Sequence, residues 1–192
     1  MHSGVIRVFA LSMVSAAALA AQEAGVPPQW EVQKQLSSLA GHFQRIQPVL
    51  EQLKPRDWVT HGAPPAYVDQ LKRTEAEIDY LLGTTKNLMA RPDKLTIALE
   101  TFFRIESVDA MLRSVAAGVR KYQNPAIADL LQSLIAGTAA DRDTLREYIV
   151  ELAADREQQF KVMDAEAQRC RASLARQPSA AGKSSGNKED GR

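Results

Sequence analysis

Residues 32–53 read VQKQLSSLAGHFQRIQPVLEQL, and apolar side chains recur along this stretch at alternating steps of four and three residues. The set is Val32, Leu36, Leu39, Phe43, Ile46, Leu50 and Leu53. Because an α-helix has about 3.6 residues per turn, this spacing places the whole set on one side. The stretch therefore predicts an amphipathic helix over residues 29–54 with a heptad seam. We expect Pro48, which lies off the seam, to kink this helix without uncovering its apolar side, and Pro55 to end it.

The helical period continues through the rest of the chain, and no stretch alternates with the period of two that strands require. Further helices are predicted over residues 64–89, 93–122, 124–137 and 138–175, connected by short segments. The second of these carries apolar residues on two faces, so we expect it to be the central helix. Short connections favour antiparallel neighbours. The predicted fold is thus all-α, an elongated antiparallel bundle of four to five helices with coiled-coil-like heptad seams.

Local signals mark where the later helices begin and end. Asn124 and Pro125 form a capping residue followed by a first-turn proline. Gly137 is expected to close or bend the short helix that follows. Thr138 with Asp141 three residues later resembles a capping box, which predicts that the last helix begins there.

Both ends of the chain differ from the predicted bundle in composition. Residues 1–20 combine one basic residue, an apolar run and small residues before the end, which is typical of a cleaved secretory signal peptide. A membrane anchor is the alternative, although the run is shorter than the roughly 20 residues that span a bilayer. Residues 177–192 are rich in Gly, Ser and charge, and we expect a disordered polar tail. Residues 21–176 then form a single domain, in the periplasm or the secreted space.

Composition excludes several classes of function. Loss of Arg7 with the signal peptide leaves 23 basic against 23 acidic residues, which argues against a nucleic-acid partner. Cys170 is the only cysteine, so no internal disulfide can form. His42 and His61 belong to no metal or haem motif, and no nucleophile elbow or phosphate-binding loop is present. We therefore expect no enzymatic activity, no cofactor, no metal site, and no membrane span after signal cleavage.

An acidic stripe runs along the predicted last helix at steps of four residues. Its members are Asp143, Glu147, Glu151 and Asp155. The simplest interpretation is a solvated face on which Arg142, Arg146 and Arg156 relieve the repulsion of a few tenths of a kcal/mol per pair. A contact for a basic partner and a weak cation site are the alternatives.

The end of the last helix carries a second candidate surface. Its apolar seam continues through Phe160, Met163, Ala167, Cys170 and Leu174. At about 1.5 Å per residue the last helix would measure roughly 57 Å and the first roughly 39 Å, so one end is expected to project from the bundle. A second copy crossing antiparallel would cover the seam and give an isologous dimer. Alternatively, the first helix or the short helix covers it within one chain, and Cys170 is then a small buried hydrophobe.

The segment 54–63 is expected to be a loop that joins the first two long helices. It contains Trp58 and His61. We interpret Trp58 as an aromatic plug at one end of the core and His61 as an exposed residue without a catalytic partner.

These observations leave two hypotheses for function. The first is a non-catalytic exported interaction protein, scaffold or chaperone-like, that binds a protein partner or itself through exposed helix faces, with the last helix as the surface. The second is a carrier that holds an apolar small molecule or a non-covalent cofactor between its helices. His42, Met89, Met111 and Met163 would be the ligating or polarizable candidates for that carrier.

Overall fold

The computed structural model describes residues 26–176, so the predicted signal peptide and the predicted tail lie outside the described residues. Helix accounts for 87% of this part of the chain, and no strand occurs in it. The elements are α1 (Gln29–Leu50), α2 (Pro55–Thr60), α3 (Ala66–Ala90), α4 (Leu95–Tyr122), α5 (Pro125–Gly137) and α6 (Ala139–Arg176). The all-α prediction is confirmed.

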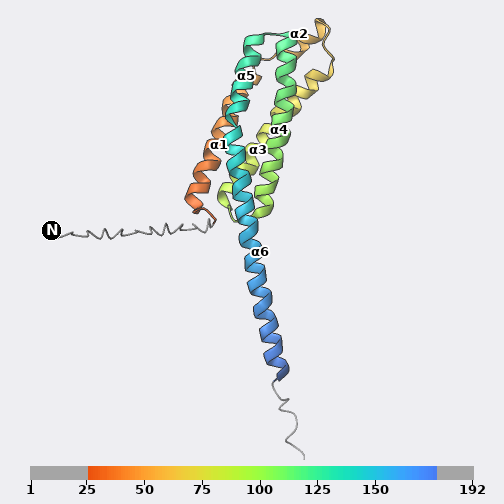
Figure 1. The fold of residues 1–192 in the computed structure, drawn as a ribbon. Coiled ribbons are helices and arrows are strands. Elements are labelled where there is room, and N and C mark those ends of the chain that lie inside the picture. Colours follow the sequence, from red (N-terminus) through yellow and green to blue (C-terminus); the bar gives the residue numbers. More distant parts are fainter. Residues whose placement is uncertain (1–25, 177–192) are drawn as a thin grey trace, which may run out of the picture.

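The long helices form an antiparallel bundle. Helix α1 packs on α3, α3 on α4, and α4 on both α5 and α6, which in turn return to α1. Figure 1 shows that α5 and α6 run in the same direction, one after the other, and together fill the fourth position of the bundle. It also shows that α6 continues far beyond the end of the bundle as a single projecting rod.

The apolar seam of α1 is buried along its whole length. All seven residues that the spacing singled out are at most 7% exposed, and Phe43 and Ile46 are at most 1% exposed. The helix continues through Pro48, which lies on the solvent side. The predicted burial of these seven residues is therefore confirmed. The predicted end at residue 54 is wrong, because α1 ends at Leu50 and a turn follows.

The segment predicted as a loop contains the short helix α2. Pro55 does not act as a terminator but occupies the first turn of α2, where its missing N–H has no intrahelical partner to lose. Trp58 on this helix is 1% exposed, as the plug interpretation requires. Its Nε1 donates to Oε1 of Gln123 at the end of α4, 2.9 Å away. His61 is exposed, as expected.

Aromatic rings close this end of the bundle. The Tyr67 ring meets the Trp58 ring edge to face, with centroids 5.6 Å apart, and lies 6.0 Å from that of Tyr122. Gly118 on α4 leaves room for this cluster, because a Cβ there would come within 2.7 Å of the Tyr67 ring. This end of the core is thus sealed by side chains from α2, α3 and α4.

Helix α4 is the central element, in agreement with the prediction from its two apolar faces. It packs against α3, α5 and α6.

Three fully buried threonines, Thr74, Thr85 and Thr101, complete the seams of α3 and α4. Each donates its hydroxyl to the carbonyl four residues earlier, at 2.8 Å. That bond satisfies the hydroxyl, so threonine can occupy a core position.

The junction of α5 and α6 confirms one capping prediction and corrects another. Asn124 caps α5, accepting from the Ala126 N–H at 2.9 Å. Gly137 ends α5, as expected. The capping box is wrong: the Thr138 hydroxyl donates back to the Ile135 carbonyl, and the Asp141 carboxylate pairs with His42 of α1. Both side chains are therefore engaged elsewhere.

Candidate interaction surface on the last helix

Helix α6 has a packed half and a projecting half. Leu145, Tyr148, Ile149 and Leu152 of the packed half are buried against the bundle. From residue 153 to residue 176 no side chain is buried. That stretch, named here the projecting half, measures about 36 Å at 1.5 Å per residue. It is the rod that leaves the bundle in Figure 1.

The projecting half keeps an apolar side. Phe160, Met163 and Leu174 are 72%, 68% and 61% exposed, and Cys170 is also exposed. Together with Ala167 these residues form what we call the projecting seam. Within residues 26–176, neither α1 nor α5 covers it, so the prediction of a cover by those helices is wrong, as is that of a buried Cys170. The reason is length, because α6 outruns every helix that could cover it.

The projecting seam lies on the same side of α6 as the buried face. Met163 follows Leu152 by eleven residues, and at about 100° per residue this is three turns plus roughly 20°. Nine large apolar side chains are exposed in the described part of the chain, and three of them, Phe160, Met163 and Leu174, belong to the projecting seam; a fourth, Val162, lies nearby on another face of α6. The other five are distributed singly over the bundle, which is ordinary for a protein surface. The projecting seam is thus a concentrated apolar strip.

The acidic stripe divides into two environments. Asp143 and Glu147 are exposed, and the guanidinium groups of Arg142 and Arg146 lie 3.8 and 3.9 Å from the Asp143 carboxylate. This portion agrees with the solvated-face interpretation. Glu151 and Asp155 are half-buried. Among residues 26–176 no group of three or more His, Cys, Asp or Glu side chains is arranged to hold a metal ion.

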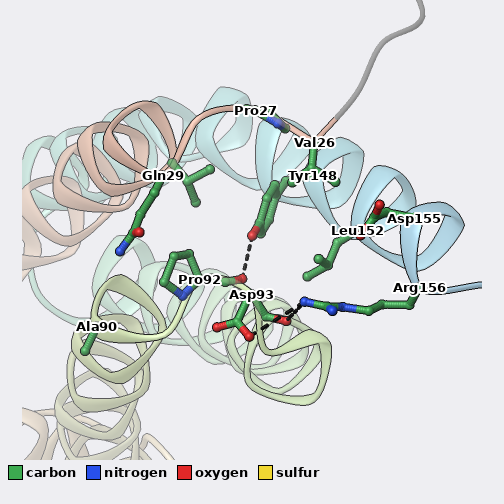
Figure 2. Close-up of a pocket in the computed structure, with 11 residues that line it drawn as sticks. Val26, Pro27, Gln29, Ala90, Pro92, Asp93, Tyr148, Leu152, Asp155 and Arg156 are labelled. Carbon is green, nitrogen blue, oxygen red and sulfur yellow. Dashed lines mark hydrogen bonds and ion pairs between the residues drawn. The ribbon is translucent and has the colours of Figure 1, made fainter. Parts of the chain in front are cut away.

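An open pocket of about 660 Å³ lies where α6 leaves the bundle. Figure 2 shows its walls: Tyr148, Leu152, Asp155 and Arg156 of α6 face Pro92 and Asp93 of the turn between α3 and α4, and Val26, Pro27 and Gln29 lie at the third side. The α6 residues that line it include two of the buried face. The pocket therefore opens on the same side of α6 as the projecting seam.

Two polar contacts hold the rim of this pocket. The Tyr148 hydroxyl donates to the Pro92 carbonyl. Arg156 donates through Nη2 to the Asp93 carbonyl at 3.0 Å and lies 3.6 Å from its carboxylate. Arg156 is also the residue that interrupts the apolar seam of α6. The position of Arg156 explains the interruption, because Arg156 lies where α6 passes the α3–α4 turn and contacts Asp93 there.

Burial raises the pKa of Tyr148 above its ordinary value, the negative charge of Asp93 raises it further, and the positive charge of Arg156 opposes this. The phenol therefore stays protonated at neutral pH and remains a donor to Pro92. The roles of Tyr148 and Arg156 in this arrangement are structural, since both fasten α6 to the α3–α4 turn.

The residues that a carrier would use are not gathered. Met163 is on the projecting half, and Met111 lines a separate pocket with Ala66 and its neighbours on α3. The Met89 carbonyl accepts from Gln33 of α1, which lies nine residues, or about 13 Å along the helix, from His42. The four candidates thus occupy separate parts of the molecule.

Sequence reasoning missed the link between His42 and Asp141 and the pocket at the root of the projecting half. Nδ1 of His42 pairs with the Asp141 carboxylate and joins α1 to α6. These partners are 99 residues apart, and Asp93 and Arg156 are 63 apart. No local spacing signals such pairs. Only the antiparallel packing of α1 and α4 beside α6 brings them together.

No helix within residues 26–176 is both long and apolar enough to cross a lipid bilayer. Comparison of the chain with protein-family models, with curated proteins and with solved structures finds no match.

Proposed function

We propose that this protein is a non-catalytic exported interaction protein, scaffold or chaperone-like, that binds a protein partner through the projecting half of α6. The observation that carries the proposal is the projecting seam, whose three largest side chains are 61–72% exposed outside the bundle. Concentrated apolar surface on a soluble protein marks an interaction site. The seam has helical spacing, so it fits a partner that presents a helix or a groove.

Energetics support a partner for this surface. A helix without tertiary packing is marginally stable, because most helix stability in proteins comes from burial of an apolar face. Burying a side chain the size of Phe, Leu or Met contributes about 1.5–3 kcal/mol. Covering Phe160, Met163 and Leu174 would therefore stabilise the projecting half and supply binding energy at the same time.

Export is the second part of the proposal and is supported by the composition of residues 1–20. It predicts that the protein recovered from its own host begins at Ala21, give or take one residue. Amino-terminal sequencing would test this. A chain that begins at Met1 and stays with the cytoplasmic fraction would refute export while leaving the interaction surface untested by that experiment.

The interaction surface can be tested by a photo-crosslinking residue at position 160, introduced into the full chain in its own host. The matched control is the same residue at Tyr80 on α3, which is 63% exposed and lies on the bundle, away from the projecting half. We expect discrete adducts from position 160 and none above background from position 80. Equal, diffuse labelling from both positions would contradict the proposal.

A further inference from the structure

We propose that the partner of the projecting half is a second copy of this chain, crossing antiparallel so that the two projecting seams cover each other. This inference rests on the function proposed above and specifies the partner. Three features of the described residues carry it: the side on which the seam lies, the distribution of charge along α6, and the order of large and small side chains in the seam.

The side of the seam excludes a parallel pair. Phe160 follows the buried Ile149 by eleven positions, and Met163 follows the buried Leu152 by the same interval. The seam therefore lies on the side of α6 that, in the packed half, faces the bundle core. A second α6 running parallel along this seam would continue into the space that α1 and α4 occupy. The α6 of an antiparallel copy instead ends before it reaches the first copy's bundle. The bundle of that second copy then lies beyond residue 176 of the first copy's α6.

The charges of the projecting half are segregated in a self-complementary way. Residues 155–166, next to the bundle, carry four acidic and two basic side chains, and one of those bases, Arg156, is already paired with Asp93. Residues 167–176 carry three arginines and no acid. An antiparallel pair sets the acidic half of one copy against the basic half of the other. A parallel pair would set like against like.

The seam fixes a register in which large side chains meet small ones. With the crossing centred near residue 165, Phe160 faces Cys170 of the other copy and Met163 faces Ala167 of the other copy, each contact occurring twice. Glu157 and Arg171 are fourteen residues, or two heptads, apart, so they lie along the same edge of the seam and face each other across the pair. Arg176 of each copy approaches Asp155 at the mouth of the other copy's pocket.

The same register places Asp164 beside its own counterpart at the centre of the crossing. This like-charge contact weakens the pair slightly. It makes a specific prediction, since removal of the charge in Asp164→Asn is expected to tighten the dimer about two-fold.

A charge-swap series measured by sedimentation equilibrium at low salt tests the pairing. Glu157→Arg and Arg171→Glu are each expected to raise the dimer dissociation constant roughly ten-fold, because each turns two attractive contacts into repulsive ones. The double variant is expected to return within about two-fold of the wild type. Additive weakening in the double variant would overturn the antiparallel register, and a wild type that stays monomeric at about 200 µM would overturn the dimer.

Disulfide trapping checks the orientation independently of affinity. In the antiparallel register the two Cys170 residues are ten positions apart along the axis, about 15 Å, which is too far for a disulfide. Phe160→Cys brings residue 160 opposite Cys170 of the other copy, and mild oxidation should yield a covalent dimer linked between those two positions. A Cys170–Cys170 disulfide in the wild type would instead establish a parallel pair and overturn the proposal.

The outcomes separate this inference from the function on which it rests. A purified chain that stays monomeric, together with position-160 adducts to another protein, would refute the second copy and leave the interaction surface in place. Loss of both adducts and dimer would refute both.

Discussion

Leu152 of α6 is 2% exposed, whereas Met163, three turns further along the same side, is 68% exposed. The two halves of the helix share one apolar side and differ only in what lies next to it. The packed half meets α1 and α4, while the projecting half has left the bundle. Periodicity therefore reports which side of a helix is apolar, but the lengths of the neighbouring helices decide whether that side is covered.

A carboxylate introduced into each half of α6 should reveal the largest difference in unfolding free energy between the two halves. Leu152→Asp buries an unpaired charge and is expected to cost about 3 kcal/mol or more of unfolding free energy. Met163→Asp at the matching position should change it by less than about 0.5 kcal/mol. Urea unfolding followed by circular dichroism at micromolar protein would measure both. Equal losses would mean that the projecting half packs like the rest.

Thiol accessibility compares the same two halves by rate. Cys170 is exposed, so it should react with a thiol reagent in the native dilute protein about as fast as in the unfolded chain. The control is Leu152→Cys in a Cys170→Ser background, whose thiol reacts only after local opening and should be slower on the order of a thousand-fold. Protection of Cys170 at every protein concentration would contradict its exposure.

The border between the two halves of α6 can be weakened by removing a single hydroxyl while the buried ring that carries it stays in place. Tyr148→Phe removes the donor to the Pro92 carbonyl and should cost about 1 kcal/mol at neutral pH. The folded protein holds the pKa of Tyr148 above its ordinary value, so above pH about 10 the unfolded chain loses this proton first and the wild type loses stability as pH rises. The gap between wild type and Tyr148→Phe should therefore shrink in that range, and a widening gap would show that the sign is wrong.

The smallest effect is expected on the solvated portion of the acidic stripe. Glu147→Lys replaces repulsion from Asp143 and Glu151, four residues to either side, by attraction and should stabilise the packed half by about 0.3–0.5 kcal/mol. Gln158→Lys on the projecting half is the matched control and should leave bundle unfolding unchanged. Destabilisation by Glu147→Lys would indicate that the stripe already binds a basic group.

Sequence periodicity predicted the architecture because the seams are long and regular, as the complete burial of the α1 seam illustrates. It missed the buried Thr74, Thr85 and Thr101, since their core role depends on a hydroxyl satisfied by the helix itself. It also missed α2, because six residues are too few to display a period. Thr74 and Thr85 on α3 stand within the seven-residue repeat of the buried leucine and isoleucine side chains around them. This repeat was the one sequence signal that could have revealed these two threonines.

The candidate surface was predicted better than its surroundings. Its apolar residues and the excess length of the last helix could be read from the chain, and the exposure of Phe160 agrees with them. The pocket at its root, with Asp93 and Arg156, could not, because those residues meet only through tertiary packing. The use of the surface by a partner stays a prediction.

Hydrogen–deuterium exchange resolved along α6 tests most directly whether the packed half is covered by other helices while the projecting half is exposed to solvent. In dilute protein we predict that amides in residues 143–152 are protected by nearly the full unfolding free energy, while those in residues 160–174 exchange several orders of magnitude faster, as in an isolated helix. Raising the concentration should slow exchange in the second segment alone. Equal and concentration-independent protection of both segments would contradict the account, since it would show that the projecting half is covered within a single chain.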